Sequence, residues 1–124
     1  MDFDNLPSPN RVLNGQYPTG LIDWGSNTWF LSGPTGTFGS NNVRFNSGVS
    51  ASFSFVSPRK LVRLDVYNSG LSASVVTVTC PGQLPATAAV PNQQQVTLTP
   101  GWNATCSNVT LSGSSLSFDN LVVQ

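Results

Sequence analysis

The sequence contains no histidine and no glutamate, and only 8% of its 124 residues are charged. Histidine is the side chain that most often serves as a general base, so the usual proton-transfer group of an enzyme is missing. Neither a nucleophile elbow around a serine nor a phosphate-binding loop is present. We therefore expect a protein without enzymatic activity. A small glycosidase is the enzymatic alternative, because two carboxylates can hydrolyse a glycosidic bond; the available ones are Asp2, Asp4, Asp23, Asp65 and Asp119.

The formal net charge is zero, since five basic residues balance five acidic ones. Binding to nucleic acid or to an anionic membrane surface requires a basic face, so we expect neither partner. No apolar run reaches the length of a membrane span, and the N-terminal residues lack the basic region and apolar stretch of a signal peptide. Serine, threonine, asparagine and glycine supply the polarity, which is typical of secreted modules. We interpret Met1 as a start added to a module excised from a larger secreted protein.

Helical periodicity is nearly absent, whereas nine prolines and eleven glycines interrupt the chain at short intervals. Short β-branched and aromatic runs lie between them, and apolar residues alternate with polar ones most regularly over 50–56 and 61–68. In the first of these runs Phe53 and Phe55 are expected in the core. The pattern predicts an all-β protein, a β-sandwich of the jelly-roll kind with about nine or ten short antiparallel strands. We expect one domain over residues 1–124.

The tetrapeptide Phe-Asp-Asn-Leu occurs at both ends of the chain, at 3–6 and at 118–121. Each copy is rich in large apolar residues and is predicted to be a strand. If the two strands are neighbours in one sheet, Asp4 and Asp119 approach each other and repel unless a cation or a shared proton joins them. Calcium, which takes carboxylate and carbonyl oxygens, would suit this pair as a structural ion. The alternative is a coincidence in which both aspartates lie in turns.

The two cysteines, Cys80 and Cys106, have no histidine and no CxxC pair with which to form a metal site. They are predicted to form one disulfide at an end of the sandwich, worth about 3–4 kcal/mol in the chain-entropy treatment. This bridge implies an oxidising, extracellular compartment. Two buried free thiols are the alternative.

Aromatic and polar residues that could bind a sugar recur in predicted loops and on one polar strand face. Trp24 and Trp29 flank a predicted hairpin loop and share one face of it, although the sequence does not decide whether this face is the core. Over 61–68 the polar face could be a sugar site or a solvated face with an ion pair. The candidate ligand-binding residues are Tyr17, Asp23, Trp24, Trp29, Arg63, Asp65, Tyr67 and Trp102.

Four segments of the chain resemble secreted jelly-roll modules of the galactose-binding-like type: 3–6, 15–17, 22–25 and 117–123. Many such modules are non-catalytic carbohydrate-binding modules attached to polysaccharide-degrading enzymes, and they often carry a structural calcium tied to the first and last strands. The resemblance thus implies a monomeric module that binds a plant or microbial polysaccharide and targets an appended enzyme to it. It adds weight to Asp4 and Asp119 as calcium ligands.

A structural or adhesion domain of a surface protein is the competing hypothesis. It predicts buried tryptophans, no response to glycans and self-association through an open sheet edge. The binding-module hypothesis instead predicts exposed aromatic rings. The sequence leaves open which glycan would be bound.

Overall fold

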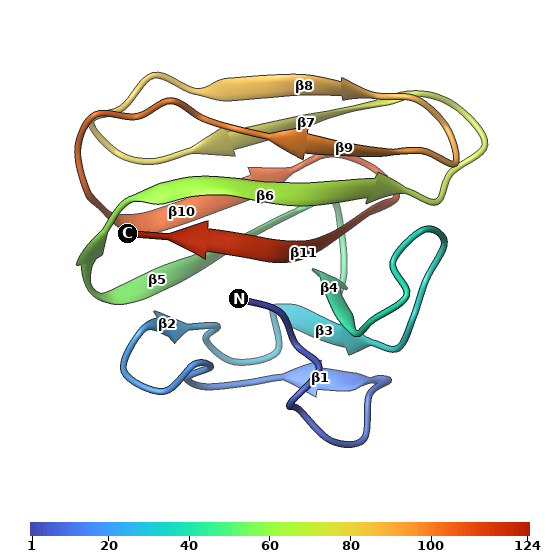
Figure 1. The fold of residues 1–124 in the computed structure, drawn as a ribbon, viewed down its shortest axis with the longest axis horizontal. Helices are drawn as coiled ribbons and strands as arrows, with labels where there is room; N and C mark the ends of the chain where they lie inside the picture. The colour runs from blue at the N-terminus through green and yellow to red at the C-terminus, as the bar shows by residue number, and fades with distance from the viewer.

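The computed structural model describes all residues 1–124, which form eleven β-strands and no helix (Figure 1). No segment therefore meets the requirement for a membrane-crossing helix. The strands form two antiparallel sheets that lie face to face. In chain order they are β1 (Arg11–Leu13), β2 (Ile22–Asp23), β3 (Trp29–Ser32), β4 (Asn42–Phe45), β5 (Ser50–Arg59), β6 (Leu61–Asn68), β7 (Ser74–Thr79), β8 (Ala86–Val90), β9 (Gln95–Leu98), β10 (Cys106–Ser112) and β11 (Leu116–Val123).

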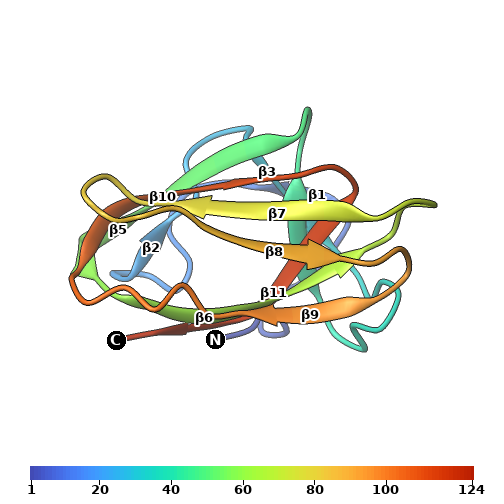
Figure 2. The same ribbon diagram turned by 90° about the horizontal axis from the view of Figure 1, so that it is seen from above.

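The last eight strands form a jelly roll. Their antiparallel pairs are nested, with β4 on β11, β5 on β10, β6 on β9 and β7 on β8. The pairs are then joined into sheets by β11 beside β6 and by β10 beside β7. The six-stranded sheet has the order β1-β3-β4-β11-β6-β9, and the five-stranded sheet has the order β2-β5-β10-β7-β8. Figure 2 shows β6 and β9 in one layer with β7 and β10 in the other. The predicted fold class is confirmed.

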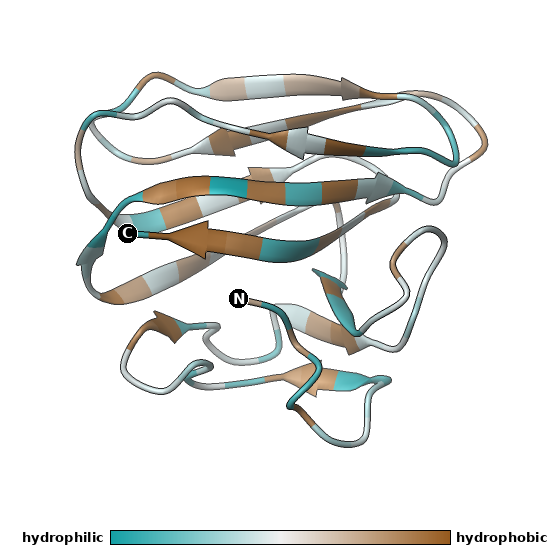
Figure 3. Ribbon diagram, in the orientation of Figure 1, coloured by the Kyte–Doolittle hydropathy of each residue, from teal (hydrophilic) through white to brown (hydrophobic).

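The core lies between the two sheets and contains a cluster of 25 buried residues. It forms because apolar and polar residues alternate along the strands, so that every second side chain points inward. Figure 3 shows this alternation as bands of opposite hydropathy along β6. Phe53 and Phe55 are buried as expected, and their rings meet edge to face at 5.5 Å between centroids.

The predicted hairpin around residues 25–28 is wrong. β2 pairs with β5 in the five-stranded sheet, whereas β3 pairs with β1 and β4 in the six-stranded sheet. Gly25 and Asn27 adopt φ angles of 75° and 63°, and the chain crosses here from one sheet to the other. Trp24 and Trp29 therefore do not share a face of one hairpin; their rings meet across the core from opposite sheets, with centroids 5.2 Å apart.

The opening segment 3–6 is a turn and not a strand, so the expected pairing of the first and last strands through it is also wrong. The amide of Leu6 donates to the carbonyl of Phe3, and the amide of Asp4 donates to the carboxylate of Asp2. These local hydrogen bonds compete with a strand ladder. Phe3 is still fully buried and packs edge-on against Trp24, with ring centroids 5.5 Å apart. Only the copy at 118–121 lies in a strand.

The predicted disulfide between Cys80 and Cys106 is present, and no free cysteine remains. Cys80 directly follows β7 and Cys106 begins β10, so the bridge joins two neighbouring strands of the five-stranded sheet at one end of the sandwich. Both residues are buried. A disulfide of this kind is typical of proteins from oxidising compartments.

Candidate functional site

The three tryptophans lie in the core. Trp24, Trp29 and Trp102 expose 1%, 0% and 4% of their surfaces. Each indole N–H donates to a backbone carbonyl, at 2.6, 2.9 and 2.8 Å respectively. No tryptophan therefore presents a free ring face for a sugar, and the exposed aromatic platforms expected of a binding module are not found at these positions.

Tyr67 is likewise buried, beneath the loop between β3 and β4. Phe38 of this loop meets the Tyr67 ring in an edge-type contact, with centroids 6.1 Å apart and an interplanar angle of 61°. Gly36 lies directly over the same ring, because a Cβ atom added there would stand 2.1 Å from Tyr67 Cζ. The Tyr67 hydroxyl donates to Gln93 Oε1 at 3.3 Å. This tyrosine anchors a loop and is not open to a ligand.

The polar face of β6 is tied to neighbouring strands. The carboxylate of Asp65 accepts hydrogen bonds from Thr97 Oγ1 at 2.7 Å and from Asn120 Nδ2 at 2.9 Å. Asp65 therefore uses cross-strand partners in place of the considered ion pair with Arg63, which is exposed. On β2, Asp23 accepts a hydrogen bond from the amide of Gly25 at 2.9 Å and so stabilises the following turn.

The N-terminal turn places Asp4 near enough to Asp119 for its charge to act on that carboxyl, but without the strand pairing on which the expectation depended. The carboxylate of Asp119 is fully buried and accepts from Ser40 Oγ at 2.7 Å, while Asp4 accepts from the amide of Asn41 at 2.8 Å. Burial raises the pKa of Asp119 above its usual value, and the negative charges of Asp2 and Asp4 raise it further. The positively charged terminal amine of Met1 donates to the carbonyl of Leu121.

The half-buried phenol of Tyr17 lies beside this acidic cluster. Burial raises the pKa of Tyr17, and the charges of Asp2 and Asp4 raise it further. A cation would stabilise a buried carboxylate that lies next to other acidic groups. However, no three carboxylate, cysteine or histidine groups converge closely enough to hold a metal ion. A calcium ion here would depend on Asp4, Asp119 and backbone carbonyls.

The largest hollow on the molecule lies beside Trp102 and has a volume of about 410 Å³. The loop between β7 and β8 forms one wall, and the loop between β9 and β10 forms the other. The disulfide between Cys80 and Cys106 fastens these two loops at their bases. We call this feature the Trp102 hollow, and its lining residues include Gln83, Leu84, Thr87, Thr99, Trp102 and Asn103.

No charged residue lines the Trp102 hollow. Gln83, Asn103, Thr87 and Thr99 contribute to its lining, and their side-chain amides and hydroxyls make no hydrogen bond within the protein. Leu84 is 85% exposed at its rim. The hollow thus combines apolar surface with free neutral donors and acceptors.

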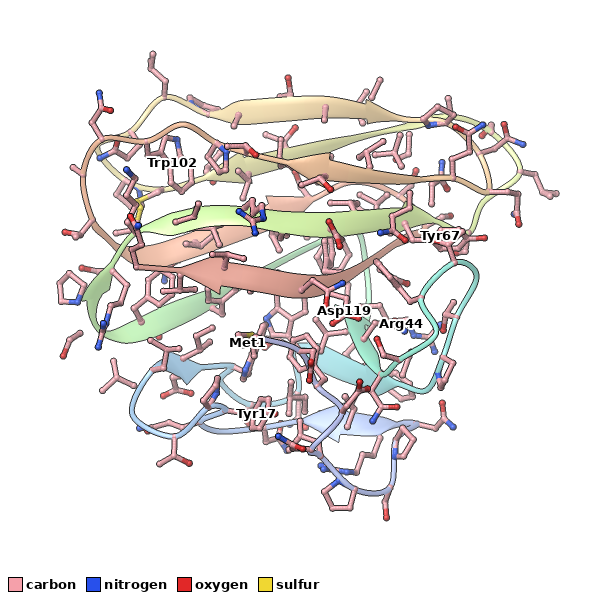
Figure 4. All side chains as sticks on the ribbon, in the orientation of Figure 1. Met1, Tyr17, Arg44, Tyr67, Trp102 and Asp119 are labelled. Carbon is pink, nitrogen blue, oxygen red and sulfur yellow. A yellow bond between two sulfur atoms is a disulfide. The ribbon has the colours of Figure 1, made fainter.

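The predicted ligand residues do not form one site. Figure 4 shows Trp102 far from Tyr17 and from Tyr67, which lie near other edges of the molecule. Of the predicted set, only Trp102 lines a hollow. The polar neighbours of Trp102 could not be found from the sequence. Gln83 and Asn103 lie in two loops that come together only through the disulfide and the pairing of strands in the folded protein. The proximity of Cys80 and Cys106 to these loops was the available signal.

Comparisons with family models, with curated proteins and with solved structures find no match for this chain.

Proposed function

We propose that this β-sandwich is a non-catalytic glycan-binding domain that holds a neutral oligosaccharide in the Trp102 hollow. The observation that carries the proposal is the absence of charge in a hollow that offers unpartnered amide and hydroxyl groups beside apolar side chains. A neutral sugar presents hydroxyl edges and apolar C–H faces, so it matches both kinds of lining. Charged ligands would find no counter-charge there.

The volume and construction of the hollow favour a short stretch of a single glycan chain. A volume of about 410 Å³ lies within the range of small-molecule sites. A hollow of this size suits a short chain segment and not a flat crystalline surface. The indole N–H of Trp102 is already bonded to the carbonyl of Leu84, so the ring supports the wall of the hollow. Binding would therefore depend on the loop amides and hydroxyls more than on stacking.

The proposal extends to the setting of the domain. We infer a secreted, monomeric module that brings an appended enzyme to a plant or microbial polysaccharide, in keeping with the disulfide and the low charge. We infer no catalytic role, because the chain offers no histidine and its aspartates serve turns and cross-strand hydrogen bonds. A structural calcium between Asp4 and Asp119 is part of the same proposal.

A structural or adhesion domain is the second candidate, and the burial of all three tryptophans favours it. Several large apolar side chains are exposed as well, which suits contact with another protein surface. They are Val49, Val56, Leu71, Val75 and Leu84.

Affinity electrophoresis on a panel of neutral soluble polysaccharides, with and without EDTA, tests the first candidate. The variants are Gln83→Ala and Asn103→Ala, which remove unpartnered amides from the hollow without disturbing the core. Asn108→Ala is the matched control, because this asparagine is also exposed but lies on β10 outside the hollow. We expect the two hollow variants to lose retardation and the control to keep it.

Two outcomes would oppose the proposal. Retardation that persists unchanged in both hollow variants would place glycan binding elsewhere on the surface. No retardation of the unmodified protein on any glycan, together with a concentration-dependent increase in mass during sedimentation, would favour the structural domain.

A further inference from the structure

A row of side chains on the outer face of the six-stranded sheet includes a positive charge, unlike the lining of the Trp102 hollow. Strand register places Phe30, Arg44, Ser117 and Tyr67 in one row across β3, β4, β11 and β6. Their neighbours along each strand point into the core, so this row points outward. The guanidinium of Arg44 lies over the ring of Phe30, at 4.6 Å from its centroid.

Arg44 and Ser117 border a pocket of about 200 Å³ where β4 ends and β11 begins. Five hydroxyl side chains line this pocket, and Arg44 is the only charged group among the lining residues. No carboxylate faces the guanidinium, which therefore keeps an uncompensated positive charge. We call it the Arg44 pocket; its hydroxyls belong to Ser32, Thr35, Ser69, Ser115 and Ser117.

Two of these hydroxyls are nearly buried but have no partner in the protein. Ser32 exposes 7% and Ser117 exposes 4% of its surface, and neither Oγ atom makes a hydrogen bond to another protein group. Their hydroxyl oxygens are still reached by solvent through the pocket, since the one fully buried side-chain polar atom without a partner is Asn42 Oδ1. Because both hydroxyls open into the pocket, a ligand there can replace the water that hydrogen-bonds them.

The walls of the pocket are held in place by other contacts. Thr35 donates to the carbonyl of Gly33 at 2.9 Å, in the loop that packs onto Tyr67. On the other side, the amide and the hydroxyl of Ser69 both donate to the carbonyl of Ser115, at 2.9 and 3.2 Å. The hydroxyls are thus positioned before a ligand arrives, which lowers the entropy lost on binding.

The size of the pocket limits the ligand. About 200 Å³ lies below the usual range for drug-sized ligands, so a single small group fits and a chain does not. A planar guanidinium pairs best with a planar carboxylate through two parallel hydrogen bonds. The surrounding hydroxyls suit a ligand whose remaining groups are also hydroxyls.

We propose that the Arg44 pocket binds a sugar carboxylate, that is, a uronic acid or a terminal uronate residue, with Arg44 on the carboxylate and Ser32 and Ser117 on ring hydroxyls. This site is separate from the Trp102 hollow, as Figure 4 shows from the positions of Arg44 and Trp102. The inference does not depend on glycan binding in that hollow. The Arg44 pocket would bind an acidic sugar, whereas the Trp102 hollow would bind a neutral one.

Titration calorimetry and amide chemical-shift mapping with sodium D-glucuronate and D-galacturonate test the proposal, with D-glucose, acetate and sulfate as comparison ligands. We expect a uronate to bind at low salt and to shift amides around Ser117. Arg44→Gln should weaken that binding by about 10-fold or more, because a charge-assisted hydrogen-bonded pair is lost. Arg63→Gln is the matched control, since Arg63 is exposed on the same sheet outside the pocket.

Ser117→Ala adds a variant that keeps the charge and removes one pocket hydroxyl. It should weaken uronate binding while leaving acetate binding unchanged. The proposal is overturned if D-glucose binds as well as the uronates, if sulfate and acetate bind as tightly as the uronates, or if Arg63→Gln has the same effect as Arg44→Gln. Absence of any uronate binding at low salt would overturn it as well.

Discussion

Removal of the disulfide should lower both stability and glycan retention. The bridge closes a loop with a sequence separation of 26 residues, and the chain-entropy treatment gives a loss of about 3.5 kcal/mol for this length. With an unfolding entropy of about 2.1 cal/mol/K for each of 124 residues, the midpoint temperature should fall by about 13 °C. The change to make is Cys80→Ala with Cys106→Ala, because both positions are buried and a serine would bury an unpaired hydroxyl there.

Urea denaturation at fixed pH, followed by tryptophan fluorescence, measures the loss of free energy. Reduced unmodified protein is the control, because it lacks the bridge but keeps both sulfur atoms and so leaves no cavity. A difference in unfolding free energy between the reduced protein and the double variant measures the effect of packing. The loss of unfolding free energy that both show, relative to the oxidised protein, measures the effect of the cross-link.

The bridge also fastens the two loops that wall the Trp102 hollow. Reduced protein, kept at a temperature at which it stays folded, should therefore bind glycan more weakly than the oxidised protein in affinity electrophoresis. A shared loss below about 1 kcal/mol would refute the argument from chain entropy. Undiminished glycan retention after reduction would refute the role given to the bridge in shaping the hollow.

Three further predictions follow from individual contacts. Gly36→Ala should destabilise the protein by about 1–3 kcal/mol more than Gly48→Ala. Both glycines have positive φ, but only a Cβ atom at Gly36 would clash with the ring of Tyr67. Equal losses of unfolding free energy in urea denaturation would show that this clash is not the cause. In EDTA, stability should rise as the pH falls from ~7 to ~4, because burial raises the pKa of Asp119 and the native state takes up the proton first. Asp119→Asn should flatten that rise, and an unchanged pH profile of the urea midpoint would contradict it. Acrylamide should quench the three buried tryptophans weakly until the protein unfolds, whereas equal native and unfolded quenching constants would be inconsistent with their burial.

Much of the sheet structure could be predicted from local pattern. The predicted strand at 61–68 matches β6, and the run at 50–56 falls within β5, because strict alternation marks a half-buried strand without reference to the rest of the fold. Phe53 and Phe55 could be placed in the core for the same reason. The disulfide could be predicted because two cysteines without a histidine or a CxxC pair leave few alternatives.

Other features could not be read from local pattern. The copy of Phe-Asp-Asn-Leu at 3–6 has the same residues as the strand at 118–121, yet it forms a turn whose phenylalanine enters the core. Identical residues adopt different structures here because the later copy lies between β4 and β6, which supply ladder hydrogen bonds, and the earlier copy has no such neighbours.

The sequence by itself determined the class of fold, the strand faces and the cross-link, since each of these follows from residue type and spacing. Only the tertiary structure decided which sheet each strand joins and which aromatic rings are buried. It also decided which polar groups meet, because Gln83 with Asn103, and Arg44 with Ser117, come together through pairing between strands distant in the chain. Such contacts depend on which distant strands pair with each other. The local sequence pattern of a strand does not specify its partner.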